Sequence, residues 1–172
     1  RGKNPEGPGT FNLNRAKFEV LNAGSSFTMK DNALLIVDRS GQPSGLFGDI
    51  NLEPQFTDVT GGEIRLGTAV TPASQTFMAS ISAALWNLSV DGTTNVKTVQ
   101  LINNPIVVQR NLSVEGSSIF NANGYNVNIG GNLNNANPSV TKGTPSNMYG
   151  GYRAGTGAAQ IAGQVTTFNG SI

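Results

Sequence analysis

The sequence Asn87-Leu88-Ser89-Val90-Asp91-Gly92 returns almost unchanged as Asn111-Leu112-Ser113-Val114-Glu115-Gly116, at an offset of 24 residues. A shorter copy, Gly131-Asn132-Leu133, follows after a further 21 residues. Repeats of about 20 to 30 residues are typical of solenoids, because each repeat is one coil that buries its apolar face against the next. The repeat therefore predicts a right-handed parallel β-solenoid, in which equivalent strands stack about 4.8 Å apart.

Short segments that alternate apolar and polar residues occur along the whole chain. Examples are Phe18-Glu19-Val20, Ile64-Arg65-Leu66 and Val127-Asn128-Ile129. Each places two apolar side chains on one face of a strand, and turn-forming residues lie on either side. The segment from Ala73 to Leu85 comes nearest to a helical period, but its Ser, Thr and β-prone residues favour a strand. The chain is expected to be all-β.

Gly and Asn are expected at the corners between strands, where the backbone adopts left-handed conformations. The expected corners, where stacked Asn amides would form ladders, are Asn103-Asn104, Asn121, Asn123-Gly124 and Asn134-Asn135. Asn123-Gly124 between two apolar runs is also a hairpin signal, so an antiparallel β-sandwich stays open as the alternative. The repeat favours the solenoid, because a sandwich has no reason to contain it.

The chain is expected to form one β-solenoid segment, residues 1–172, of a longer protein. Two regions rich in Gly and other small or turn-forming residues, 40–56 and 138–163, are interpreted as insertions, and Gln164 to Phe168 resumes strand character. Because neither an initiator Met nor a signal-like segment opens the sequence, the chain is expected to be a piece of a longer protein or a mature piece whose targeting signals are gone. Its longest apolar run, Ala33 to Val37, is too short to span a membrane, so no membrane insertion is expected.

The amino-acid composition excludes several classes of function. The chain has no Cys and no His, which excludes disulfides, thiolate nucleophiles, His bases and most zinc sites. Charged residues make up 12% and the net charge is +1. Because nucleic-acid-binding surfaces carry a basic excess, no nucleic-acid partner is expected.

Residues 60–137 resemble the repeat unit of very large Bacteroidetes cell-surface proteins, similar to gliding-motility adhesins and other cargo of the type IX secretion system. The motifs that carry the resemblance are Gly62-Glu63-Ile64-Arg65-Leu66-Gly67, Ser74-Gln75-Thr76-Phe77 and Leu85-Trp86-Asn87-Leu88-Ser89-Val90. The resemblance implies a secreted protein at the cell surface, associated with the outer membrane, with secretion or motility machinery as partners. The family supplies no catalytic residues.

Few side chains qualify as site residues. Trp86 is the only tryptophan and could stack on a sugar, whereas Tyr149, Tyr152 and Arg153 form an aromatic-plus-Arg group in a Gly-rich stretch. Asp49, Asn51 and Glu53 could ligate Ca²⁺, the one cofactor considered. The densest acids are interpreted as a solvated loop rather than catalytic carboxylates: Asp31, Asp38, Asp49, Glu53 and Asp58.

The function expected from these observations is a structural and adhesive segment of a cell-surface protein, with no catalytic residues and no enzymatic activity. The segment would act as a rigid stalk or as a multivalent module that binds surfaces or glycans, beside other domains of the same chain. Two alternatives remain. One is a pectate-lyase-like enzyme that degrades polysaccharides, and the other is a segment of a phage or appendage fibre.

Overall fold

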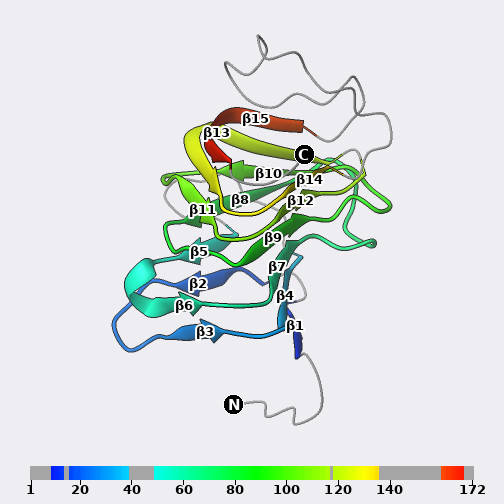
Figure 1. Ribbon diagram of the computed structural model, residues 1–172. Helices are drawn as coiled ribbons and strands as arrows, with labels where there is room; N and C mark the ends of the chain where they lie inside the picture. Colours follow the sequence, from blue (N-terminus) through cyan, green and yellow to red (C-terminus); the bar gives the residue numbers. More distant parts are fainter. Residues whose placement is uncertain (1–8, 14–15, 39–48, 117, 136–159, 169–172) are drawn as a thin grey trace.

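The computed structural model describes residues 9–13, 16–38, 49–116, 118–135 and 160–168, with the backbone alone described for residues 135 and 160–168. The described part is all-β, apart from one 3-10 turn at Pro54–Phe56. Every strand pairing in it is parallel, and the strands stack from the N-terminal side to the C-terminal side of the molecule (Figure 1). The alternative of an antiparallel sandwich is therefore wrong.

A six-stranded sheet contains one strand from each passage of the chain, and we call one such passage a coil. Leu88 pairs with Leu112, and Leu112 pairs with Leu133. The offsets of 24 and 21 in the sequence repeat thus equal the number of residues that separate paired positions on neighbouring strands. The strands lie in sequence order: β1 (Thr10–Asn12), β4 (Leu34–Val37), β7 (Glu63–Leu66), β9 (Asn87–Val90), β12 (Leu112–Val114) and β14 (Leu133–Asn135).

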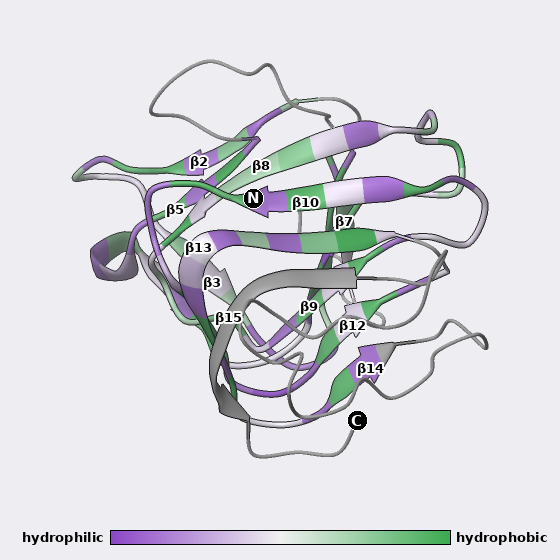
Figure 2. Cartoon of the chain, turned by 90° about the horizontal axis from the view of Figure 1, so that it is seen from above, coloured by the Kyte–Doolittle hydropathy of each residue, from purple (hydrophilic) through white to green (hydrophobic). Residues whose placement is uncertain are grey.

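The second sheet has seven strands, six of them on its main path, and curls at one end. The first residues of β13 pair with β10 and its last residues pair with β11, so β13 bends from one side of the molecule to the next (Figure 2). The sheet contains β2 (Phe18–Val20), β5 (Ile50–Leu52), β8 (Gln75–Ile81), β10 (Lys97–Leu101), β13 (Ile119–Ile129) and β11 (Ile106–Val108), while β15 (Gln160–Phe168) pairs with β13. A third sheet pairs β3 (Phe27–Met29) with β6 (Thr57–Val59).

Asn123 and Gly124 lie inside β13, at the bend. Their φ angles are 51° and 83°, in the left-handed region that Asn and Gly adopt most readily. The hairpin interpretation of this dipeptide is wrong, because the strand bends here without reversing direction. Asn103 also has a positive φ, of 69°, as expected at a corner. Asn121 and Asn134, in contrast, lie within strands and not at corners.

The core consists of apolar side chains that point inward from all three sheets. Along β8 the buried residues Phe77, Ala79 and Ile81 alternate with half-buried ones, and Figure 2 shows the same alternation of hydropathy along the strands. Among the residues that the structure describes, Phe77 and Phe120 are the largest apolar side chains that are fully buried. Burial of each large apolar side chain contributes about 1.5 to 3 kcal/mol. Because each coil covers its neighbours, this core is continuous along the stack.

The structure changes the boundaries of the two expected insertions. Ile50–Leu52 forms β5, a fully buried strand, whereas the sequence predicts that these residues belong to the insertion 40–56. Gly and Pro in the preceding residues conceal this short Ile-Asn-Leu alternation. Of the insertion 138–163, residues 160–163 belong to β15, and the remainder lies outside the described residues. The segment from Ala73 to Leu85 contains β8, as the sequence predicts.

Candidate functional site

A polar pocket of about 500 Å³ lies at the carboxyl ends of four neighbouring strands, β2, β5, β8 and β10. Equivalent ends of parallel strands in successive coils meet at one edge, so residues from four coils converge there. The turns that follow these strands supply most of the lining. The lining residues are Leu21, Asn51, Leu52, Glu53, Pro54, Gln55, Ser80, Ser82, Asn103 and Asn104.

The floor of the pocket is organised around the hydroxyl of Ser80. The side-chain amides of Asn103 and Asn104 both donate to its Oγ atom, each at 3.3 Å. The two donated N–H groups occupy the lone pairs of this oxygen, which leaves the hydroxyl proton to be donated. Asn51 lies in the preceding coil, at the position that pairs with Ser80. Its side-chain amide donates a hydrogen bond to the carboxylate of Glu19 at 3.3 Å. A row of polar side chains therefore runs across the coils.

Three further groups in the pocket make no hydrogen bond or ion pair to another described residue. They are the carboxylate of Glu53, the side-chain amide of Gln55 and the amide oxygen of Asn104. Ser82 donates to the carbonyl of Leu52 at 3.3 Å and keeps its lone pairs as acceptors. Leu21 and Pro54 add apolar surface. The pocket thus offers neutral donors and acceptors with one carboxylate, and no described residue of its lining has a cationic side chain.

A charged cluster lies on the outer face of the six-stranded sheet. Nε of Arg65 is 3.0 Å from Oε1 of Glu63, and its Nη2 lies 3.5 Å from Oε1 of Glu115, two coils away. Ser89, on the coil between, donates to Glu63 at 2.5 Å. Burial acts to lower the pKa of Arg65. The hydrogen bond and charge of Glu63, with the charges of Glu115 and Asp91, outweigh burial and raise this pKa above its ordinary value.

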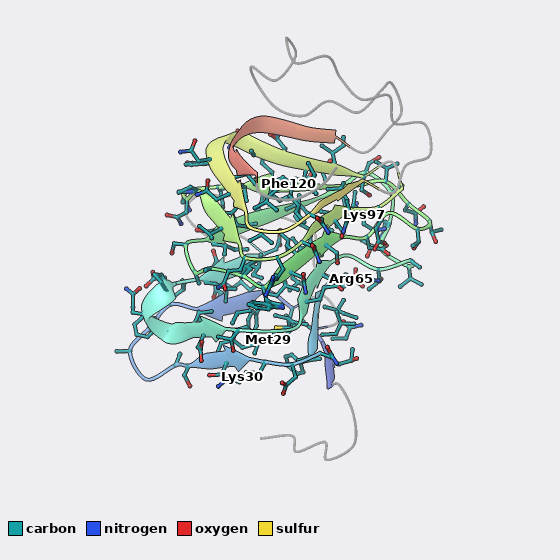
Figure 3. All side chains as sticks on the ribbon, viewed as in Figure 1. Met29, Lys30, Arg65, Lys97 and Phe120 are labelled. Atoms are coloured by element: carbon teal, nitrogen blue, oxygen red, sulfur yellow. The ribbon has the colours of Figure 1, made fainter. Side chains whose placement is uncertain are left out.

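A buried ion pair lies on the same side of the molecule, where Figure 3 shows Lys97 beyond Arg65 along the stack. Nζ of Lys97 is 2.8 Å from Oδ2 of Asp91, and the two side chains are 0% and 3% exposed. Lys97 Nζ also donates to the carbonyl of Asn95 at 2.9 Å. Ser118 accepts from the backbone N–H of Lys97 and donates to the carbonyl of Asp91, which links this corner to the next coil.

Trp86, the candidate for sugar stacking, is half-buried against the core. The guanidinium carbon of Arg110 lies 4.7 Å from the centroid of its ring, so a cation–π contact covers one face. Arg110 follows Trp86 by one coil and donates its backbone N–H to the carbonyl of Trp86. Stacking of a sugar on that face requires Arg110 to move. The other three candidates, Tyr149, Tyr152 and Arg153, lie outside the described residues.

The three residues of the candidate Ca²⁺ site lie along β5 and its flanks. Asp49 is buried and accepts the backbone N–H of Met78 at 2.8 Å, and the amide of Asn51 donates to Glu19. Glu53 faces the pocket instead. Within the described residues, no group of three or more acidic side chains is placed to hold a metal ion. Asp38, another of the densest acids, accepts hydrogen bonds from Thr68 and Thr71.

The sequence does not predict most of the pocket. Of the lining residues, the sequence indicates Asn51 and Glu53 as metal ligands and Asn103-Asn104 as a corner. The signal that identifies Ser80 and Gln55 is positional: polar residues lie at the ends of apolar strands that share one edge. The turns differ in length from coil to coil, which hides this convergence in the sequence.

Comparisons with protein-family models, with curated proteins and with solved structures find no match for this chain. The class that its structure defines is an all-β protein with parallel sheets. No helix in the described part of the chain is long and apolar enough to cross a membrane.

Proposed function

We propose that the chain is a segment of a right-handed parallel β-solenoid that serves as a rigid, adhesive part of a large cell-surface protein. One observation supports this proposal above the others. Strands of successive coils pair in parallel and in register along the six-stranded sheet, from β1 to β14. A chain of this kind adds a fixed rise with every coil and buries each coil against its neighbours, which makes a stiff spacer.

The surface supports the adhesive half of the proposal. The outward residues along β8, β10 and β13 are mostly uncharged polar side chains, such as Thr76, Thr98, Gln100 and Asn121. Such a face suits many weak contacts to a hydroxylated surface, which gain strength when repeated along one chain. The gliding-type adhesins that residues 60–137 resemble would place the segment outside the cell, beside secretion or motility machinery.

Surface labelling of intact cells tests the proposal directly. Antibodies raised against this chain should label intact cells of the source organism as strongly as permeabilised ones, and external protease should remove the signal. Labelling that requires permeabilisation would contradict the proposed location. Small-angle scattering of longer pieces of the same protein tests the stiffness, because a rod lengthens in proportion to the number of coils.

An enzyme of the pectate-lyase class is the second candidate, and the charged cluster is the observation that favours it. Glu63, Arg65 and Glu115 come from three coils and meet on one sheet face. The three side chains are paired with one another across the coils, so we assign the cluster a structural role. Turnover of a neutral or acidic polysaccharide that is lost in Glu63→Gln would favour the enzyme over the adhesin.

A further inference from the structure

We propose that the pocket between β2, β5, β8 and β10 binds a neutral saccharide, with its long direction across the strands and along the stack of coils. This inference rests on the proposed adhesive function and names the ligand class that the pocket would take. It depends on three properties of the site: which hydrogen-bonding groups are free, what charge they carry and how far the lining extends.

The free groups match the hydroxyls of a sugar ring. Each sugar hydroxyl both donates and accepts, so it is best bound by a donor and an acceptor placed side by side. Ser80 supplies a donor, Glu53 and Asn104 supply acceptors, and the amide of Gln55 supplies both. The two amides that converge on Ser80 fix the position of its oxygen, which lowers the entropy lost when a ligand binds.

The charge of the pocket selects among saccharides. Among the described residues that line it, there is one carboxylate, on Glu53, and no Lys or Arg. A uronate or sulfated sugar would place a second negative charge close to Glu53 without a cation to balance it, which disfavours binding. A neutral sugar meets no such cost. Leu21 and Pro54 can cover the C–H face of a ring.

The extent of the pocket suits a chain and not a single ring. Its lining comes from four successive coils, and strands in a sheet lie about 4.8 Å apart. The lined edge is therefore about 14 Å long, which accommodates more than one sugar unit. The row from Glu19 through Asn51 to Ser80 continues the polar surface in the same direction.

Calorimetric titration of the full chain with neutral hexasaccharides of glucose, mannose and N-acetylglucosamine tests the proposal, with trigalacturonate as the anionic comparison. We expect at least one neutral probe to bind, trigalacturonate to bind more weakly, and the side-chain amide resonances of Gln55 and Asn104 to shift. Ser80→Ala should raise the Kd about tenfold, the effect of one lost hydrogen bond. Glu53→Gln should raise the Kd by a similar factor, because a neutral amide oxygen accepts a hydrogen bond more weakly than a carboxylate does.

Ser113→Ala is the matched control. Ser113 also accepts an Asn amide, from Asn134 at 3.2 Å, but it lies on the six-stranded sheet away from the pocket, so this variant should bind like the native chain. Glu53→Gln removes no contact to a described residue and should leave folding intact even if Ser80→Ala does not. Failure of every neutral probe to bind, equal binding of trigalacturonate, or unchanged binding by both pocket variants would overturn the inference. These outcomes would not change the result of the cell-labelling experiment. The failure of this inference can therefore be distinguished from the failure of the proposed function.

Discussion

The side chain of Asn87 accepts a hydrogen bond from the backbone N–H of Asn111, one coil further along the chain, at 3.1 Å. Asn111 repeats the contact, because its side chain accepts from the backbone N–H of Asn132 at 3.0 Å. The amide of Asn87 also donates to the carbonyl of Gly62 at 2.9 Å, in the coil before. An asparagine ladder thus joins four coils at one corner through side chain to backbone contacts.

Replacement of Asn87 by Ala should lower the free energy of unfolding by about 2 kcal/mol, since two hydrogen bonds between coils are lost. Chemical denaturation followed by far-ultraviolet circular dichroism measures this change. Asn22→Ala is the control, because Asn22 is exposed and its side chain bonds no described residue. Equal stability of the two variants would show that the ladder contributes nothing.

The ion pair between Lys97 and Asp91 predicts non-additive effects of substitution. Asp91→Asn should cost about 3 to 5 kcal/mol, because it leaves the buried ammonium of Lys97 without its counter-charge. The double variant Asp91→Asn with Lys97→Met removes both charges and should recover much of this loss. Denaturation of both single variants and the double variant gives the coupling energy. Additive losses would argue against a direct pair.

Gly92 is expected to tolerate no side chain. A Cβ atom built on it would lie 1.7 Å from the backbone oxygen of Glu115 in the next coil. Gly92→Ala must therefore separate two coils, and we expect a loss above about 3 kcal/mol, beyond the usual cost of overpacking. Gly124→Ala is the comparison, since its Cβ would meet no atom of the described residues within 4 Å, and the strain comes from the positive φ of 83°. That strain costs about 1 to 2 kcal/mol. In thermal melts, the midpoint temperature of Gly92→Ala should therefore lie below that of Gly124→Ala.

Arg65 should contribute modestly to stability, in a salt-dependent way. Arg65→Gln removes ion pairs to Glu63 and Glu115, and about 1 kcal/mol is expected because these groups are partly exposed to solvent. Lys17→Gln removes a more exposed pair, with Glu19, and should change stability less. In urea titrations at low and high ionic strength, the free energy of unfolding of Arg65→Gln should approach that of the native chain as the salt concentration increases. A salt-independent loss would indicate packing as its cause.

The sequence predicts the parts of the fold where coils repeat closely and conceals the parts where coils differ. Leu88, Leu112 and Leu133 occupy equivalent positions in similar peptides, so their register follows from the offsets alone. Between Leu34 and Glu63 the same register spans 29 residues, because a longer connection precedes β5. No repeated motif marks that coil, so the sequence pattern indicates an insertion where β5 lies.

Side chains with unusual surroundings were also beyond prediction. Lys97 is expected at the surface, since Lys is almost never fully buried without a partner. Its burial depends on Asp91, six residues away, and on Gly67, whose missing side chain leaves room for the Lys97 stem. The pocket depends in the same way on where four turns converge. Both features arise from contacts between coils that no local pattern encodes.

The position of Trp86 gives the protein an internal optical reporter. It is the only tryptophan in the chain and lies between the coils that begin with β7 and β9, with Arg110 against its ring. Its fluorescence therefore monitors the middle of the stack, whereas circular dichroism averages over every strand. If the terminal coils fray first, the dichroic signal will decline before the emission shifts. If the two transitions coincide, the whole stack melts as one cooperative unit.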